Sequence, residues 1–280
     1  MLQGSCWYTG DVTVKWTATD AESAITSSPC ADNVLTTNSA ATTFTCTATS
    51  EGGSATGSVT IKRDASTPVV TAAVGGTQGA DGWYTSDVRV TWSAQSSVSP
   101  VSTTPCAAVS LTTDTGGVTY TCSATNEAGR SGTGTVTVKR DATRPAIGYS
   151  GNAGSYTVDM TVNITCAASD ATSGLAANTC ADITGPGYTF ALGTTSFAAT
   201  ATDRAGNVGE ANGSFTMGVS SSTVCTLVQR WSSSEGVANS LCGKLSRGDY
   251  APFRLEVRAQ SGKKITAEQA TILLRLVDGL

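Results

Sequence analysis

The sequence predicts a mainly β protein, built from tandem β-sandwiches and followed by a small α-helical bundle. Three observations carry this prediction. Short segments in which apolar and polar residues alternate are separated by Gly, Asn, Asp and Ser. A block of about 75 residues occurs three times along the chain. After residue 220 the apolar residues change to a spacing of three and four, which is typical of helices.

The composition fits a folded chain whose surface is polar but weakly charged. Of 280 residues, 39% are hydrophobic and 14% are charged, and Thr, Ser, Ala and Gly fill the difference. The net charge of −4 argues against a nucleic-acid partner, which would need a basic face. Histidine is absent, which excludes Ser–His and Cys–His catalysis within these residues. No apolar run reaches the roughly 18–20 residues of a membrane span.

The first two copies of the repeat match over most of their length. The run WYTGDVTVKW becomes WYTSDVRVTW, and VTIKRDAS becomes VTVKRDAT. Two tryptophans and two cysteines recur 76 positions later, where Trp7, Trp16, Cys30 and Cys46 become Trp83, Trp92, Cys106 and Cys122. A third, more diverged copy contains VNITC (162–166), a cysteine at 180 and SFAATATDRAGN (196–207). Matching of this extent cannot reasonably arise by chance.

The second copy shows the strand pattern most clearly. Alternating segments predict strands near 68–74, 87–94, 118–125 and 133–139. NEAGR (126–130) and DRAGN (203–207) are predicted hairpin turns, because glycine adopts a positive φ without steric cost. Several short strands joined by such turns are typical of a β-sandwich rather than of a helical repeat.

Two proline-containing segments, DASTP (64–68) and DATRP (141–145), are the predicted junctions between domains. The predicted domains are repeat 1 (1–66), repeat 2 (67–143), repeat 3 (144–219) and a helical domain (220–280). Repeat 1 lacks the opening strand that precedes Trp83 in repeat 2. The chain is therefore expected to be the carboxy-terminal piece of a longer protein or to be cut inside a domain. We also expect an intermolecular contact at this incomplete edge.

The helical domain shows three apolar stripes at helical spacing. Their members are Val224, Leu227, Val228 and Trp231; Val237, Leu241 and Leu245; and Leu273, Leu276, Val277 and Leu280. Thr266 followed by Gln269 predicts a capping box, and Gly262 is placed to end the preceding helix. We expect three or four short helices around a thin core that needs a covalent staple.

Nine cysteines in a chain of low charge favour an oxidising compartment and disulfides. Repeats 1 and 2 each contain a pair 16 residues apart, which predicts the bonds Cys30–Cys46 and Cys106–Cys122. Closing a loop of that length stabilises a domain by about 3 kcal/mol. A metal site is not expected, because the sequence has neither histidine nor a Cys-x-x-Cys pair.

Repeat 3 contains a different pair of cysteines. Alignment of DRAGN with NEAGR places Ala199 at the position of Cys122, so the downstream partner is lost. A cysteine instead appears at 166, where the other repeats have Trp16 and Trp92, and it precedes Cys180 by the same 14 residues. These positions are therefore expected to meet in the core, which predicts the bond Cys166–Cys180.

The last three cysteines lie outside this pattern. Cys225 and Cys242 fall on the first two predicted helices and are expected to join them. Cys6 is left over, at the position of Gly82. It is expected to be unpaired, and the alternative is a bond to an upstream segment or to another chain.

The run GWYTSDVRVTWSA, followed by Thr-rich strands and SATNEAG, resembles the bacterial immunoglobulin-like repeats of extracellular proteins, particularly those of Gram-positive actinobacteria. TATDRAGN is similar to the closing hairpin of such repeats. The resemblance covers roughly residues 1–219 and implies tandem immunoglobulin-like β-sandwiches in secreted or surface-attached proteins. GVANSLCGKL and VRAQSGKKITAEQATILL resemble the FIMAH-type helical domain found at the ends of similar proteins. Phe253 matches that family's phenylalanine, whereas RLEV departs from its pattern.

The leading functional hypothesis is a non-catalytic extracellular or cell-surface stalk, spacer or adhesion segment that needs no cofactor. Its expected partner is a surface protein or a glycan. The second hypothesis is an accessory region of a secreted enzyme whose catalytic domain lies upstream. Fold resemblance alone does not decide between them.

A third hypothesis is ligand binding by the sandwiches themselves. Trp83 and Tyr84 could stack on sugars if they are exposed, although the favoured interpretation is that Trp7 and Trp83 pack at a strand end and Trp16 and Trp92 fill cores. Calcium is a weaker alternative, with oxygen ligands from Asp20, Asp170 or Asp203. The KRD triplets at 62–64 and 139–141 are interpreted as a solvated charged junction, with an Arg–Asp contact between neighbouring domains as the alternative.

Overall fold

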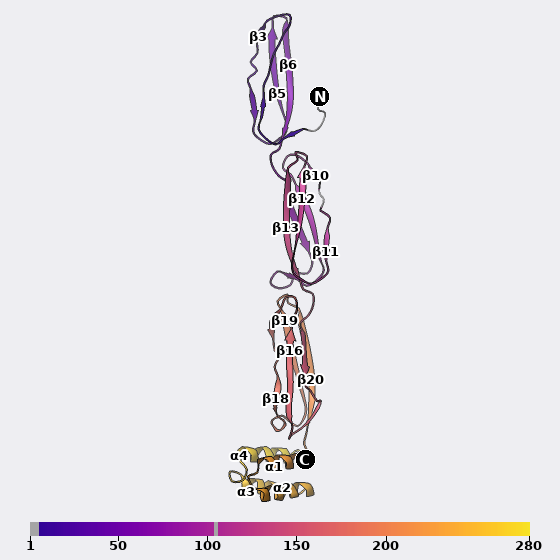
Figure 1. The fold of residues 1–280 in the computed structure, drawn as a ribbon, viewed down its shortest axis with the longest axis vertical. Helices are drawn as coiled ribbons and strands as arrows, with labels where there is room; N and C mark the ends of the chain where they lie inside the picture. The colour runs from indigo at the N-terminus through magenta and orange to yellow at the C-terminus, as the bar shows by residue number, and fades with distance from the viewer. Residues whose placement is uncertain (1–5, 104–105) are drawn as a thin grey trace. The chain divides into compact units, whose positions relative to one another are not determined.

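The computed structural model describes residues 6–103 and 106–280. The chain divides into two compact units, Met1–Ala142 and Thr143–Leu280. The amino-terminal unit contains repeats 1 and 2, and the carboxy-terminal unit contains repeat 3 and four helices (Figure 1). The protein is therefore mainly β with a helical carboxy-terminal domain, as the sequence predicts.

Repeat 2 shows the complete sandwich. Its strands are β7 (Val69–Gly75), β8 (Trp83–Tyr84), β9 (Val88–Gln95), β10 (Val101–Thr103), β11 (Val109–Leu111), β12 (Thr115–Asn126) and β13 (Ser131–Arg140). They form two sheets, in the orders β11-β9-β7 and β10-β12-β13-β8. Among the described residues of this repeat, β8 and β13 are the pair that runs in parallel. Two facing, mostly antiparallel sheets joined by crossovers form an immunoglobulin-like sandwich.

The predicted strands and turn of repeat 2 are confirmed. The four strands expected from the alternation correspond to β7, β9, β12 and β13, with ends that differ by a few residues. The turn between β12 and β13 contains Gly129 at φ 75°. Val88, Val90, Leu111 and Val138 form the buried core between the sheets. Along β9 the buried Val88 and Val90 lie on either side of the exposed Arg89, so the alternation that predicted this strand also marks its inward face.

Repeat 1 has the same plan without an opening strand among its described residues. Its strands are β1 (Trp7–Tyr8), β2 (Val12–Val14), β3 (Ile25–Ser27), β4 (Asn33–Leu35), β5 (Ser39–Ser50) and β6 (Gly53–Arg63). They form sheets in the orders β1-β6-β5-β3 and β2-β4. Strand β2 has 3 residues, whereas its counterpart β9 has 8. The pairing of β9 with β7 continues along β9 as far as Gln95. Among the described residues of repeat 1, the strand that pairs with β2 is β4, and no counterpart of β7 lies on its other side.

Repeat 3 repeats the plan with a more aromatic core. Its elements are β14 (Ala146–Ser150), β15 (Ser155–Thr157), β16 (Thr161–Ser169), β17 (Leu175–Asn178), β18 (Ile183–Pro186), the 3₁₀ helix η1 (Gly187–Thr189), β19 (Gly193–Asp203) and β20 (Val208–Gly218). The sheets are β14-β16-β18 and β15-β20-β19-β17. Phe215 makes edge-to-face contacts with Tyr156 and Phe190. Such aromatic contacts add to the hydrophobic burial.

The helical domain consists of α1 (Ser221–Trp231), α2 (Glu235–Arg247), α3 (Tyr250–Gln260) and α4 (Ala267–Val277). The predicted capping box of Thr266 and Gln269 is confirmed at the start of α4. The expectation of a thin core is wrong, because the buried helix residues belong to one cluster with the core of repeat 3. Leu227, Leu241, Phe253 and Leu273 are all fully buried in it.

The opening strand of each complete sandwich lies against glycines of the last strand. A Cβ on Gly134 of β13 would lie 2.5 Å from the carbonyl oxygen of Val70, and a Cβ on Gly132 would collide with the carbonyl oxygen of Pro68. In repeat 3, a Cβ on Gly209 would collide with Pro145 in the same way. Glycine therefore permits the close approach of the two backbones that closes the sandwich.

We predict that Gly134→Ala destabilises the protein by about 1–3 kcal/mol, because the added methyl group overpacks the contact with β7. Urea unfolding monitored by the NMR signals of repeat 2 measures this effect. The matched control is Gly57→Ala at the equivalent position of repeat 1, where a Cβ would approach only the Trp16 ring, at 3.3 Å. An equal loss of stability in the two variants would contradict this account of β7.

Candidate functional site

The junction between repeats 1 and 2 is built around a buried carboxylate. Asp64 follows β6, and its side chain is 0% exposed. One carboxylate oxygen accepts hydrogen bonds from the backbone N–H of Ser99 at 2.9 Å, from its hydroxyl at 2.6 Å and from the amide of Asn126 at 3.3 Å. The other accepts hydrogen bonds from the N–H and the hydroxyl of Ser66. The carboxylate thus joins the end of repeat 1 to two loops of repeat 2.

These donors stabilise the ionised form of Asp64. Burial raises the pKa of the carboxyl. The hydroxyls of Ser66 and Ser99 and their backbone N–H groups lower it by more, so the net effect is a decrease from 3.8 to about 2. A buried charge is tolerated when enough hydrogen-bond donors replace its hydration. The junction is therefore expected to hold its charge throughout the neutral range.

The arginine before Asp64 acts within its own repeat. Arg63 donates hydrogen bonds to the carbonyl of Gly10, to Asn38 and to Asp11, each at 2.8 Å. Arg140 of repeat 2 binds Asp114 at 2.5 Å and Asp87 at 2.8 Å. Both arginines are buried. The expectation of a solvated KRD junction is therefore wrong, and the Arg–Asp contacts lie inside each repeat rather than between repeats.

The structure joins eight of the cysteines in four disulfides. Cys30–Cys46 and Cys106–Cys122 each connect a loop to the long strand of the four-stranded sheet, β5 or β12. Cys166–Cys180 connects the equivalent loop of repeat 3 to β16 in the opposite sheet. The sequence comparison had predicted this difference in the bonded strand from the exchange at position 199.

Hydrogen bonds occupy the place of the missing bond in repeat 3. The N–H of Thr200 on β19 donates to the hydroxyl of Thr179 at 2.9 Å, and the N–H of Thr179 donates to the carbonyl of Thr200, also at 2.9 Å. Thr200 follows Ala199, the counterpart of Cys122, and Ala199 is itself buried. The loop therefore remains attached to both sheets, by a disulfide on one side and by hydrogen bonds on the other.

The remaining cysteines lie outside the sandwiches' cores. Cys225 and Cys242 join α1 to α2 with a Cα–Cα distance of 5.0 Å. Cys6 is exposed and is the free cysteine of the described residues. The expectation that the bonded positions meet in the core holds only for Cys122, because Cys46 and Cys166 are half-buried at its margin.

The aromatic residues proposed for sugar stacking are packed against protein. Trp83 is 7% exposed, and the ammonium group of Lys139 lies 5.1 Å from the centre of its ring. Tyr84 packs against the core of repeat 2, as Trp92 does. The expectation that Trp83 is exposed for sugar stacking is therefore wrong, whereas Tyr84 is half-buried. Trp7 is contacted by Lys62 at 5.6 Å, and Trp16 lies beside the core of repeat 1.

The three aspartates considered for calcium each organise a turn. The Asp20 carboxylate accepts hydrogen bonds from the N–H groups of Glu22 and Ser23 and from the Ser23 hydroxyl. The Ser50 hydroxyl, together with these donors, lowers the pKa of the carboxyl. Carboxylate oxygens of Asp170 and Asp203 lie within 4.8 Å of each other. Both carboxylates accept N–H groups of their own turns.

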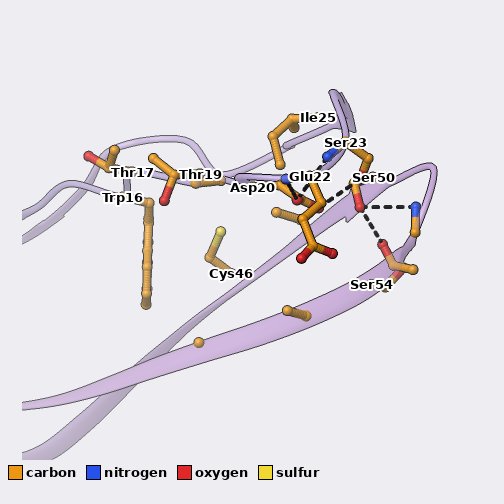
Figure 2. A pocket seen from close by; sticks show the side chains of 16 residues that line it. Trp16, Thr17, Thr19, Asp20, Glu22, Ser23, Ile25, Cys46, Ser50 and Ser54 are labelled. Atoms are coloured by element: carbon orange, nitrogen blue, oxygen red, sulfur yellow. Dashed lines mark hydrogen bonds between the residues drawn. The ribbon is translucent and has the colours of Figure 1, made fainter.

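Repeat 1 contains a groove of about 690 Å³. Figure 2 shows Trp16 and Cys46 toward one end and Asp20, Glu22 and Ser50 toward the other. The segment that follows β2 forms one wall, and small residues of β5 and β6 form the floor. These floor residues are Cys46, Ala48, Ser50, Gly53, Ala55 and Gly57. No sequence pattern identified this groove, because its lining residues come together only in the fold.

Comparisons with known proteins identify no family for this chain. No family model matches, and no curated protein matches. Among solved structures, the fibronectin(III)-like modules of Clostridium thermocellum CbhA are 13% identical, with a TM-score of 0.25, and cover 52% of this chain and 93% of their own. The extracellular domain of Protocadherin GammaB4 is 11% identical, with a TM-score of 0.28, and covers 75% of this chain and 44% of its own.

The eight amino-terminal immunoglobulin domains of Down Syndrome Cell Adhesion Molecule are 9% identical, with a TM-score of 0.25, and cover 77% of this chain and 39% of their own. At such TM-scores these likenesses carry no argument, and the assignment of the fold rests on the sheet orders. Among the described helices, none is both long enough and apolar enough to traverse a lipid bilayer.

We predict that the Asp64 junction weakens in acid. Its folded pKa of about 2 lies below the ordinary 3.8, so its contribution to stability is present above about pH 4 and is lost as the pH falls toward 2. NMR titration of the carboxyl carbon and hydrogen exchange of the Ser99 N–H measure the effect. Asp64→Asn should exchange faster at neutral pH and lose this pH dependence. A carboxyl that titrates near 4 would contradict the assignment.

We also predict that the double substitution Cys166→Ala and Cys180→Ala lowers the free energy of unfolding by about 3 kcal/mol, because it opens a loop of 14 residues. Urea unfolding monitored on repeat 3 measures the change, and Cys6→Ala is the control because that thiol is exposed and free. A peptide map that joins Cys166 to any residue other than Cys180 would refute the bond.

Proposed function

We propose that this chain is a non-catalytic extracellular segment, an immunoglobulin-like stalk or spacer that serves in structure or adhesion. The observation that carries the proposal is the junction at Asp64. A fully buried carboxylate with hydrogen-bond donors from two loops of the next repeat joins consecutive sandwiches through a specific contact rather than through a flexible linker. Such a contact limits bending, which is the property that a spacer needs.

The disulfides support an extracellular location. Each of the three sandwiches and the helical domain contains one. Disulfides persist in oxidising environments and are rare in reducing ones. Small domains with a modest buried surface depend on such bonds for a large share of their stability. A protein that must remain folded outside the cell would gain most from this arrangement.

The outer strand faces support the same proposal. Pairs of hydroxyl groups face each other across neighbouring strands, among them Thr43 with Thr60, Thr47 with Thr56, Thr119 with Thr137, and Ser150 with Thr165. These pairs cover the sheets with polar groups that carry no charge. Threonine also favours strands, so one residue type provides both strand propensity and solubility.

The finer proposal follows the resemblance of the sequence. Residues 1–219 are proposed to be repeats of the bacterial immunoglobulin-like type, and the domain from residue 220 onward to be FIMAH-like. The division at 66, 143 and 219 is part of this proposal. The partner is proposed to be a surface protein or a glycan.

Under mechanical load, we predict that each disulfide withholds 14 to 17 residues from extension, which is roughly 50–60 Å of chain per bond. Single-molecule stretching should therefore show longer unfolding steps after reduction than before it.

A direct test of location is antibody labelling of intact cells of the organism that produces the chain. Labelling that requires permeabilised cells would overturn the extracellular assignment, and equal step lengths before and after reduction would overturn the mechanical role of the disulfides.

A further inference from the structure

The two long strands of repeats 1 and 2 carry paired hydroxyl groups on their outer face, the face turned away from the core. In repeat 2 the cross-strand pairs of this face are Thr119 with Thr137, Thr121 with Thr135, Ser123 with Thr133 and Thr125 with Ser131. Three of these pairs are joined by hydrogen bonds of 2.8 to 3.0 Å between the hydroxyl oxygens. Three equivalent pairs of repeat 1 are joined at 2.8 Å. Most hydroxyl groups of this face therefore bind one another.

Repeat 3 departs from this pattern at two neighbouring pairs of β19 and β20. Ser196 pairs with Ser214, and Ala198 pairs with Asn212, where repeat 2 has threonine at all four positions. The four side chains are exposed on the outer face. Within the described part of the chain, the side chains of Ser196, Asn212 and Ser214 form no hydrogen bond with one another or with other residues. Their donors and acceptors are therefore free to bind a ligand.

A hollow lies over these two pairs. Its volume is about 520 Å³, and its lining consists of Ser196, Phe197, Ala198, Asn212, Gly213 and Ser214. Serine lacks the methyl group of threonine, and alanine lacks its hydroxyl group, so the shorter side chains leave room above the sheet. Small-molecule sites in proteins have volumes of about 300–1,000 Å³ and contain a few convergent polar groups. The hollow has both properties.

The floor of the hollow is fixed from the side of the core. Phe197 packs against the core of repeat 3, and its ring centre lies 4.6 Å from that of Tyr149. A Cβ on Gly213 would lie 2.6 Å from the Phe197 ring, so the ring lies directly against the glycine backbone. The Asn152 side chain donates a hydrogen bond to the carbonyl of Ser214 at 2.9 Å and holds β20 from its other side. A floor that is already ordered reduces the entropic cost of binding.

The charges around the hollow favour a neutral ligand. None of the residues that line it is charged. The next cross-strand pair of the same face joins Thr200 to Glu210, and both side chains are exposed. The Glu210 carboxylate repels a carboxylate or sulfate group bound one pair away, because that separation is shorter than the Debye length at physiological salt. Hydroxyl groups of a neutral sugar, in contrast, both donate and accept hydrogen bonds, as serine and asparagine side chains do.

We propose that this hollow on the outer face of repeat 3 binds a neutral glycan. The Asn212 amide donates to one sugar hydroxyl and accepts from another, and the hydroxyls of Ser196 and Ser214 bind the neighbouring ones. The methyl group of Ala198 contacts the C–H groups of the sugar ring. The proposal gives a site and a chemical class to the glycan partner proposed above, and it rests on the partner being a glycan rather than a protein.

Titration of the oxidised full-length protein with chitotriose and with mannotriose, followed by amide NMR signals, tests the proposal. We expect at least one of these neutral sugars to shift the amides of residues 196–198 and 212–214 in a saturable way, with a Kd of about 1 mM or lower. The O-sulfated form of that sugar should bind more weakly at low salt. The proposal is overturned if neither neutral sugar shifts these amides, if the shifts lie on another face, or if the sulfated form binds more tightly.

Variants of the protein locate the binding to the hollow. The double variant Ala198→Thr and Asn212→Thr recreates the pair Thr121–Thr135, which repeat 2 accommodates in the same register, and fills the hollow. It should keep its melting temperature and bind at least about tenfold more weakly. Asn212→Ala removes only the amide and should weaken binding about fivefold. Thr200→Ser, on the same face outside the hollow, is the matched control and should bind normally. Unchanged affinity of either hollow variant would also overturn the proposal.

Failure of this test is separable from failure of the stalk proposal. The hollow lies within repeat 3, whereas the spacer role rests on Asp64 and the disulfides. A protein that binds no sugar would still show faster exchange at Ser99 after Asp64→Asn. Each result therefore judges one proposal without deciding the other.

Discussion

The close packing of the opening strand against the last strand is the contact on which each sandwich depends. Glycines on β13 and β20 let the carbonyl oxygens of Pro68, Val70 and Pro145 lie so close to these strands that a Cβ would collide with them. That strand covers one face of the core and extends the sheet edge beside it. Where it is present, the valines of the core are sealed from solvent. The described residues of repeat 1 contain no such strand; there a groove lies over small residues, and β2 has three residues.

The three sandwiches share a fold, but their disulfides do not all join the loop to the same strand. In all three repeats the loop between the sheets carries a cysteine, and only the bonded strand changes. The exchange preserves the entropic benefit of a closed loop, since that benefit depends on loop length rather than on which strand is bonded. The local geometry adapts through Thr179 and Thr200, whose hydrogen bonds hold the loop to β19.

The Asp64 junction and the groove lie in different parts of repeat 1. At one end of the repeat, the Asp64 carboxylate accepts hydrogen bonds from the N–H and the hydroxyl of Ser99 in repeat 2. Along its groove the same repeat presents a floor of Gly, Ala and Ser. The buried contact of Asp64 is consistent with the structural function proposed above.

Much of this architecture followed from the sequence alone. The alternation along 87–94, the turn glycine at 129 and the capping box at Thr266 are local patterns, and local patterns determine strands, turns and helix ends. Comparison of the three repeats also predicted which cysteines form disulfides, because the cysteine spacing is the same in the first two copies and changes in the third.

The tertiary structure decided the rest, namely what each residue meets. KRD is one run in the sequence, yet Arg63 turns inward to Asp11 while Asp64 binds Ser99, 35 positions away along the chain. Trp83 is buried beneath Lys139, as the favoured interpretation of the sequence had it, but only the fold shows which residue covers the ring. The groove is lined by β5, β6 and the segment after β2, which lie apart in the sequence. Burial, pKa and open surface depend on contacts between distant segments, and a local pattern carries no information about those contacts.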